Sequence, residues 1–282
     1  MDAGLAPRCY EFANELTQLY LNSAPPYPLA PLVEHFGVSG VRERPLDRDA
    51  CLISESGRLF IDVNSLYPLV RRRLSIAHEI GHLIVQCCSK EGTLNGAHED
   101  PGIEGLCNRL AAQLLAPEWA LKRYFTGEDT LANWQNPVRC VTLLRAASEF
   151  SVSVDAMASR VFCESSLAPD SAAVIWRHIS NSAKPGSEEA LRISSAWHQT
   201  QGKMYIPRNK TAPPDSVIRK ASEQHGVFCA TEDLSLGTLR GKFTIEAAGF
   251  GLEHTTARPE HVRPVLSIIS PQSDRPASCN LN

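Results

Sequence analysis

The sequence has no continuous apolar run of the length that crosses a membrane, which takes about 18 residues. The longest candidate, residues 76–88, is interrupted by His78, Glu79 and His82. The N-terminal segment MDAGLAPRCYEFANELTQLY also lacks the basic start and apolar core of a secretory signal. We therefore expect a cytoplasmic protein with no membrane partner.

An excess of basic residues is also absent, since 28 Lys and Arg stand against 31 Asp and Glu for a formal charge of −3. Proteins that bind nucleic acids usually carry a basic excess on the binding surface. Residues 143–161 have the pattern of a helix-turn-helix, but Arg145 and Arg160 are offset by Glu149 and Asp155. We therefore expect these helices to close a domain, and we do not expect direct DNA binding.

A Cys-x-x-Cys pair is missing, which leaves a zinc ribbon or a thioredoxin-like dithiol without support. The nine cysteines are odd in number and irregularly spaced, and Cys87 and Cys88 are neighbours that would point to different sides of a helix. A disulfide framework is therefore not expected. We interpret the thiols as small buried hydrophobic groups in a reducing compartment.

The length of 282 residues, at 30.9 kDa, suits one large domain or two modest ones. Helical periodicity dominates the first part of the chain, and short strand-like segments divided by Gly and Pro follow Ala168-Pro169. We predict an α+β domain over 1–168, a smaller α/β domain over 169–271 and a flexible tail over 272–282.

Hydrophobic periodicity and turn residues also predict the individual elements. In the first domain we expect a hairpin over 50–55 and 58–63 and helices over 10–22, 29–36, 68–88, 102–115, 138–149 and 154–164, the last two forming the pair that closes the domain. In the second domain we expect a helix over 216–225 and strands over 172–180, 190–199, 241–251 and 264–270.

The strongest chemical signal is the run HEIGH at positions 78–82. On a helix, residues four apart lie on nearly the same face, so His78 and His82 can bind one metal ion. Glu79, about a quarter turn away, can reach a water molecule in an open coordination position. Zinc fits because it accepts neutral imidazoles and keeps one exchangeable site. We therefore predict one Zn²⁺ ion on the two histidines, with Glu79 as general base.

A third ligand has to come from elsewhere. The metzincin pattern would need a histidine at position 88, which is Cys, so that branch is excluded. A thermolysin-like arrangement takes a glutamate from a second helix, and Glu104 opens such a helix with Asn108 four residues later on the same face. The alternatives lie in a loop: His98, Glu99 and Asp100. We prefer Glu104, because a helix positions a ligand more rigidly, and expect Asn108 to accept the outer N–H of a metal-bound histidine.

Two segments carry a family resemblance, RRRLSIAHEIGHLIVQ over 71–86 and IEGLCNRLAAQLLAP over 103–117. They are similar to the ImmA/IrrE family of bacterial zinc metallopeptidases, whose pattern is an Arg-rich lead into AHExGH, then an acidic residue, Asn and a small-residue helix ending in Leu-Leu-x-Pro. The preceding strand IDVN also fits, and the resemblance covers about residues 28–164. This chain departs from the pattern at positions outside the chemistry: Gln86, Gln113 and Ala116.

The resemblance implies a zincin-like (gluzincin) domain with a small sheet packed on the active-site helices. It also implies that His78, His82 and Glu104 are the zinc ligands and that Glu79 is the general base. Members of the family pair with or act upon helix-turn-helix repressors, and cleavage releases transcription in mobile-element, phage or stress responses. The implied activity is therefore that of an endopeptidase with a repressor as protein substrate. Because IrrE-type members continue into a GAF-like sensor domain, such a domain is a hypothesis for 169–271.

Two alternatives to proteolysis stay open: a zinc-containing regulator that binds a repressor or DNA without cutting it, and a partner in a toxin–antitoxin pair. If the chain is a peptidase, the strand over 58–63 can bind an extended substrate by strand addition. Leu59, Phe60 and Ile61 are therefore candidate substrate-binding residues.

Overall fold

The computed structural model describes residues 4–21, 23–89, 100–127, 138–165, 167–179, 190–199, 205–251 and 263–272. The chain divides into two compact units. The N-terminal unit comprises Met1–Leu121 with Ala147–Ala156, and the C-terminal unit comprises Lys122–Ala146 with Met157–Asn282. The predicted domain boundary after residue 168 and the hypothesis of a sensor domain over 169–271 stay predictions. The loop candidates His98 and Glu99 and the tail from 273 lie outside the described residues.

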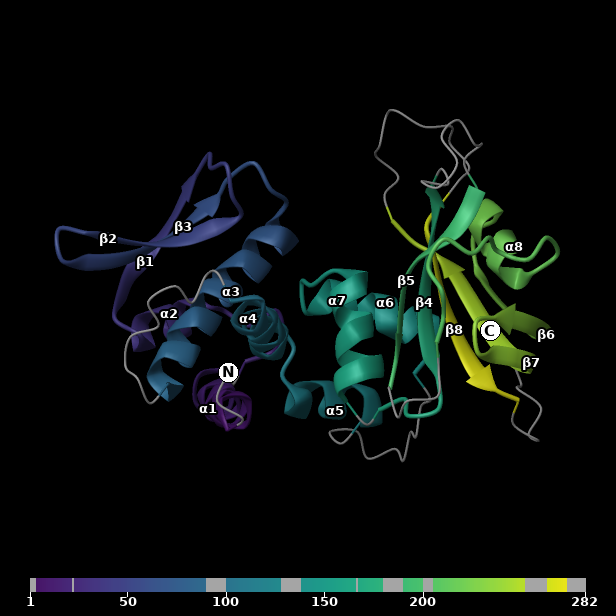
Figure 1. The fold of residues 1–282 in the computed structure, drawn as a ribbon, viewed down its shortest axis with the longest axis horizontal. Helices are drawn as coiled ribbons and strands as arrows, with labels where there is room; N and C mark the ends of the chain where they lie inside the picture. The colour runs from purple at the N-terminus through teal and green to yellow at the C-terminus, as the bar shows by residue number, and fades with distance from the viewer. Residues whose placement is uncertain are drawn as a thin grey trace. The chain divides into compact units, whose positions relative to one another are not determined.

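A three-stranded sheet forms one layer of the N-terminal unit (Figure 1). Its strands are β1 (Val38–Arg44), β2 (Ala50–Glu55) and β3 (Arg58–Asn64), in the order β1-β3-β2. β2 and β3 form the predicted antiparallel hairpin, whereas β1, which the sequence analysis missed, pairs with β3 in parallel. β3 is therefore the central strand, and β2 is an edge strand of this sheet.

The helices of the same unit lie on one side of this sheet (Figure 1). They include α1 (Leu5–Tyr20), α2 (Ala30–His35), α3 (Leu69–Cys88) and α4 (Pro101–Leu115). α3 contacts β2 and β3 and packs along α4, and α1 contacts both α3 and α4. Among the described residues, no helix combines the length and apolarity that a bilayer crossing requires.

Local sequence explains both helices of the motif region. α4 begins at Pro101, one residue before the predicted start at 102, because the Asp100 carboxylate accepts a 2.7 Å hydrogen bond from the Gly102 N–H and caps the helix. It ends at Leu115, just before Pro117. α3 buries an apolar face that also contains Glu79 and His82. The polar motif residues are thus held inside the packed layer rather than at its surface.

Shorter helices follow along the chain: α5 (Glu118–Thr126), which was not predicted, α6 (Cys140–Glu149), α7 (Val154–Ser159) and the π-helical turn η2 (Arg160–Glu164). α6, α7 and η2 occupy the predicted helices over 138–149 and 154–164. Within the N-terminal unit, the Tyr27 ring packs on Trp119 and Phe150 with centroid distances of 5.7 and 5.9 Å. These contacts bury aromatic area from three distant segments of the chain.

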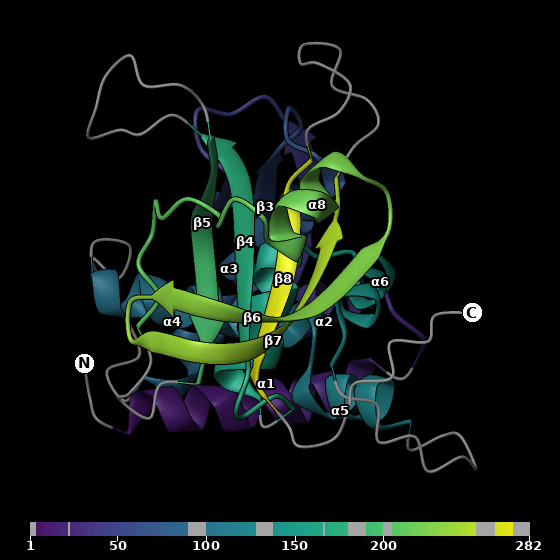
Figure 2. The same cartoon turned by 90° about the vertical axis from the view of Figure 1, so that its right-hand side faces the viewer.

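The C-terminal unit is built on a five-stranded sheet of order β5-β4-β8-β7-β6. The elements are β4 (Ala172–Ile179), β5 (Ala190–His198), α8 (Val217–Glu223), β6 (Val227–Leu236), β7 (Leu239–Gly249) and β8 (Val265–Pro271). Every pairing among the described residues of this sheet is antiparallel, so this region is of the α+β type rather than the predicted α/β type. Figure 2 shows α8 lying across one face of the sheet.

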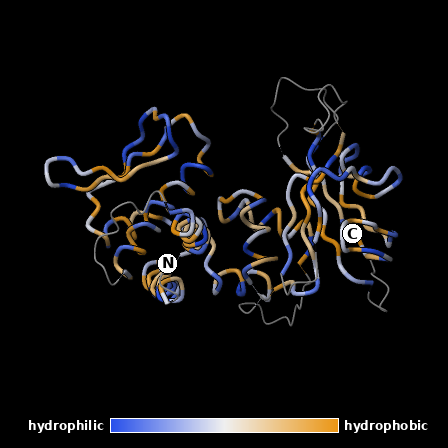
Figure 3. The backbone as a smooth tube through the Cα atoms, viewed as in Figure 1, coloured by the Kyte–Doolittle hydropathy of each residue, from blue (hydrophilic) through white to orange (hydrophobic). Residues whose placement is uncertain are grey.

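Apolar side chains of β4, β5, β7, β8 and α8 form the core of this unit, among them Val174, Trp176, Ile193, Ile218 and Ile269. Figure 3 shows the apolar stretches along these strands. The indole N–H of Trp176 donates a 2.8 Å hydrogen bond to the Ser267 hydroxyl, so the largest buried side chain leaves no polar atom unsatisfied.

Candidate metal centre

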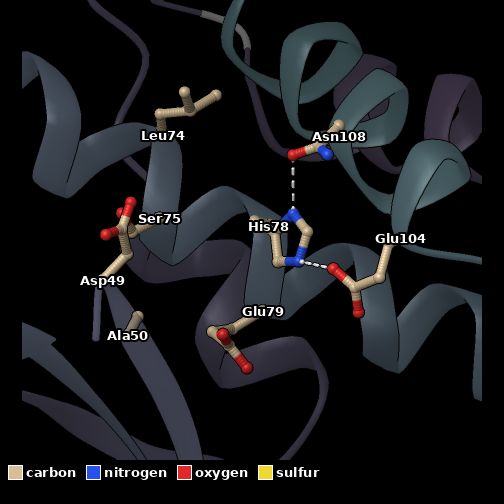
Figure 4. Close-up of a pocket in the computed structure, with 8 residues that line it drawn as sticks. All are labelled: Asp49, Ala50, Leu74, Ser75, His78, Glu79, Glu104 and Asn108. Atoms are coloured by element: carbon tan, nitrogen blue, oxygen red, sulfur yellow. Dashed lines mark hydrogen bonds and ion pairs between the residues drawn. The ribbon is translucent and has the colours of Figure 1, made fainter. Parts of the chain in front are cut away.

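The two histidines of α3 and the glutamate of α4 meet at one point. The Nε2 atoms of His78 and His82 lie 3.1 Å apart. The Glu104 carboxylate reaches both, with Oε2 3.2 Å from Nε2 of His78 and Oε1 3.3 Å from Nε2 of His82. Figure 4 shows the Glu104 carboxylate directed at the His78 ring. Helix packing thus brings the distant carboxylate to the pair that is spaced by one helical turn.

These distances fit a shared divalent cation. Four ligands at about 2.0–2.1 Å around a tetrahedral zinc ion are separated from one another by about 3.3–3.4 Å. The two Nε2 atoms lie 3.1 Å apart, and each lies 3.2–3.3 Å from one oxygen of Glu104, which is close to that separation. Two imidazoles and one carboxylate are also a donor set that zinc accepts. The residues present therefore fit a metal ion.

The outer nitrogen of each histidine contacts another residue of α4. Nδ1 of His78 lies 3.0 Å from Oδ1 of Asn108, the contact that the sequence predicted. Nδ1 of His82 lies 3.4 Å from Sγ of Cys107, a residue that the sequence analysis missed. Its position three residues after Glu104, on the same helix face, is the signal that points to it. Burial, followed by the negative charge of Glu104, raises the pKa of the Cys107 thiol to about 12.

Glu79 lies beside these groups with one oxygen unpaired. Its side chain is buried, at 5% exposure, and its carboxylate accepts a hydrogen bond from the backbone of Leu52 in β2. Oε2 has no hydrogen-bond partner among the described residues. Burial, followed by the charge of Glu104, raises the pKa of Glu79 to about 7. A buried carboxylate with a free oxygen is suited to accept a proton from a bound reactant.

A cavity of about 330 Å³ opens onto this site. Its lining residues come from the start of β2, from α3 and from α4: Asp49, Ala50, Leu74, Ser75, His78, Glu79, Glu104 and Asn108. Figure 4 shows Asp49 and Ala50 on one side of Glu79 and His78, and Glu104 and Asn108 on the other. Asp49 is fixed by a two-point ion pair with Arg71 at 3.0 and 3.1 Å. The edge strand β2 therefore leads directly to the cavity.

The predicted substrate-binding strand needs correction. Leu59, Phe60 and Ile61 lie on β3, whose backbone pairs with β1 on one side and with β2 on the other. Because both sides are occupied, strand addition at these residues is not possible, and none of them lines the cavity. Among the alternative ligands, Asp100 is engaged as the N-cap of α4 and does not join the cluster of His78, His82 and Glu104.

Comparison with known proteins gives one family. Residues 32–162 match the family Peptidase M78, described as the IrrE N-terminal-like domain. No curated protein matches the chain. A transcriptional regulator of Mycobacterium tuberculosis has a similar fold, with a TM-score of 0.55 at 12% identity over 93% of this chain and 76% of that chain. Residues 32–162, which contain His78, Glu79, His82 and Glu104, therefore form a domain of the Peptidase M78 (IrrE N-terminal-like) family, which confirms the predicted ImmA/IrrE resemblance.

Proposed function

We propose that the chain is a zinc-dependent endopeptidase in which His78, His82 and Glu104 hold one Zn²⁺ ion and Glu79 is the general base. One observation carries the proposal: the Nε2 atoms of His78 and His82 lie 3.1 Å apart, and each lies 3.2–3.3 Å from one oxygen of Glu104, beside a buried carboxylate. The free oxygen of that carboxylate faces no partner among the described residues. Membership of a metallopeptidase family supports the same chemistry.

A bound zinc ion would supply a Lewis acid that polarises the scissile carbonyl and acidifies a water molecule. Glu79 takes the proton of the attacking water on its unpaired oxygen and returns it to the leaving amide nitrogen. The hydrogen bond from Leu52 holds the other carboxylate oxygen and so orients the base. Asn108 keeps the ring of His78 in place through Nδ1.

We place the substrate along β2 instead of β3. The Asn64 N–H donates to the Asp49 carbonyl, so alternate residues further along β2 pair with β3. The backbone groups of Ala50, Leu52 and Ser54 therefore point away from β3. The Leu52 backbone already contacts Glu79, which puts this row of groups beside the cavity. An extended protein segment can add to this edge by hydrogen bonds from its main chain.

The substrate that best fits the family is a helix-turn-helix repressor, whose cleavage would relieve repression in a mobile-element, phage or stress response. The similar fold of a transcriptional regulator agrees with a role in gene control. A repressor substrate also implies a cytoplasmic enzyme. Neither direct DNA binding nor a membrane partner is part of the proposal.

The test is to incubate the full chain with the helix-turn-helix repressor encoded beside its gene and to detect fragments by mass spectrometry. Wild type should cut at one peptide bond, and a zinc chelator should stop the reaction. Glu79→Gln should lower the rate at least about 100-fold while the zinc content stays unchanged. Glu15→Gln, an exposed glutamate of α1, is the matched control and should cut at the wild-type rate. Cleavage by Glu79→Gln at the wild-type rate would overturn the proposal.

The second candidate is a regulator that binds the repressor without cutting it, which the fold of the M. tuberculosis regulator favours. The same variant separates the two functions, because Glu79→Gln removes the base but leaves the surface of the protein unchanged. If cells carrying Glu79→Gln show the full loss of repression, binding of the repressor is sufficient, and the second candidate, a non-proteolytic regulator, is correct. If repression persists in those cells, proteolysis is required.

A further inference from the structure

The outer nitrogens of the two histidines contact different atoms, and both atoms belong to α4. Nδ1 of His78 faces the Asn108 amide oxygen at 3.0 Å, and Nδ1 of His82 faces the Cys107 sulfur at 3.4 Å. Residues 104, 107 and 108 follow one another at the i, i+3, i+4 spacing of a single helix face. One face of α4 therefore supplies the third ligand and a contact for each histidine.

Which nitrogen of His82 carries the proton depends on whether Nε2 binds a cation. When Nε2 gives its lone pair to a cation, the neutral ring carries its proton on Nδ1. That N–H then points at the sulfur of Cys107, which can accept it as a weak acceptor. His82 and Cys107 are both buried, at 7% and 0% exposure. In so dry a place the orientation of the imidazole depends on the protein groups around it.

Gly81 makes this contact possible. A Cβ atom on Gly81 would lie 3.1 Å from the carbonyl oxygen of Cys107 and 3.2 Å from its Cα. α3 and α4 therefore approach closely beside His82, where the residue without a side chain faces the backbone of Cys107. The same close approach that carries the sulfur to His82 carries Glu104 to both histidines.

We infer that Cys107 is a positioning residue for His82, accepting its Nδ1–H and fixing the ring so that Nε2 faces the metal position. The inference rests on the proposed zinc site and adds a residue to it. Cys107 takes no part in the chemistry of hydrolysis. Its loss should loosen one ligand and weaken metal binding by about tenfold, the lower end of the effect of such outer contacts.

The test measures the zinc dissociation constant of the full chain by competition with a chromophoric chelator. Cys107→Ala should bind zinc about tenfold more weakly than wild type. Cys107→Ser keeps an acceptor at this position and should recover most of the affinity. The matched control is Cys9→Ala, because Cys9 is a thiol of the same unit with the same 0% exposure. Cys9→Ala should bind zinc as tightly as wild type.

A second readout separates orientation from packing. In the zinc-loaded protein with ¹⁵N-labelled histidine, the Nδ1–H of His82 should exchange slowly with water in wild type and faster in Cys107→Ala. Equal zinc affinity of Cys107→Ala and wild type, or equal weakening by Cys9→Ala, would overturn the inference alone. Failure of wild type to bind zinc would overturn the proposed function together with it.

Discussion

Each unit buries a glutamate, and the two carboxylates have opposite surroundings. Glu246 of β7 is 7% exposed and Glu79 of α3 is 5% exposed. The Glu246 carboxylate accepts a 2.7 Å hydrogen bond from the Cys140 N–H and pairs with the Arg139 guanidinium. It also lies at the start of α6, where the helix dipole favours a negative charge. Glu79 has one backbone donor, and its second oxygen has no partner among the described residues.

The difference separates a glutamate that stabilises the fold from the one that we propose as the general base. Burying a carboxylate is costly unless hydrogen bonds and an opposite charge compensate for the lost water. Glu246 has both forms of compensation, whereas Glu79 forms no ion pair among the described residues, and the charge of Arg48 offsets its burial only in part. A protein tolerates an uncompensated group where a ligand or reactant completes its surroundings. The pairing of the buried carboxylate, rather than its burial, therefore distinguishes Glu79 from Glu246.

The strongest way to break this comparison is to remove the same charge from both sites. Glu246→Gln should lower the free energy of unfolding by about 2 kcal/mol, because the buried Cys140 N–H and the Arg139 guanidinium, itself 35% exposed, lose a charged acceptor. Glu79→Gln should change the free energy of unfolding of the metal-free protein by less than about 1 kcal/mol, because no ion pair is lost. Chemical denaturation of both variants measures this, and equal destabilisation would show that the comparison is wrong.

The site itself could be predicted because most of it is local. The spacing of His78 and His82 fixes their common face as soon as the segment is helical. Pro101 starts the second helix and so sets Glu104 in its first turn, as the structure has it. Cys107 could not be found in the same way, because its contact with His82 depends on how closely α3 and α4 approach at Gly81. The spacing of residues along one helix does not predict the distance between two helices.

The sheets show the same limit. The hairpin of β2 and β3 was predicted from its turn at Ser56-Gly57, but β1 (VSGVRER) is short of apolar residues and pairs with a strand distant in sequence. Without β1, β3 was taken for the accessible strand, and the substrate residues were assigned to it. The predicted fold class of the C-terminal region was wrong for a similar reason, because the residue pattern of a strand does not show whether it pairs in parallel or antiparallel.

Two glycines near the site, Gly81 of α3 and Gly105 of α4, differ in how closely other atoms pack around them. A Cβ on Gly81 would meet the Cys107 backbone at 3.1 Å, whereas one on Gly105 would meet only the end of the Arg109 side chain, at 3.6 Å. Gly81→Ala should therefore cost about 1–3 kcal/mol of stability and weaken zinc binding. Gly105→Ala should be neutral or stabilise α4 by up to about 1 kcal/mol. Thermal unfolding of both variants measures the difference, and similar melting temperatures would contradict a tight approach at Gly81.

The smallest effect is expected for substitutions in β2, the strand whose backbone donates a hydrogen bond to Glu79. Ser54 is exposed, and its N–H points away from β3, so Ser54→Pro removes one donor from the free edge and leaves the ladder with β3 intact. If a substrate strand adds to β2, the loss of one main-chain hydrogen bond should raise KM about fivefold, or about 1 kcal/mol. The rate at saturating substrate and the zinc content should not change, because Ser54 does not line the cavity.

Ile53→Pro is the matched control, since the neighbouring N–H faces Phe60 of β3. It should disturb the ladder, lower stability and reduce kcat as well, because the backbone donor to Glu79 belongs to Leu52, the residue just before Ile53. A rise in KM with both variants and a fall in kcat with only the second would place the substrate on β2 and the general base behind it. An unchanged KM in Ser54→Pro would instead mean that the substrate reaches Glu79 without using this edge, and the single backbone contact of the buried carboxylate would then serve only to orient it.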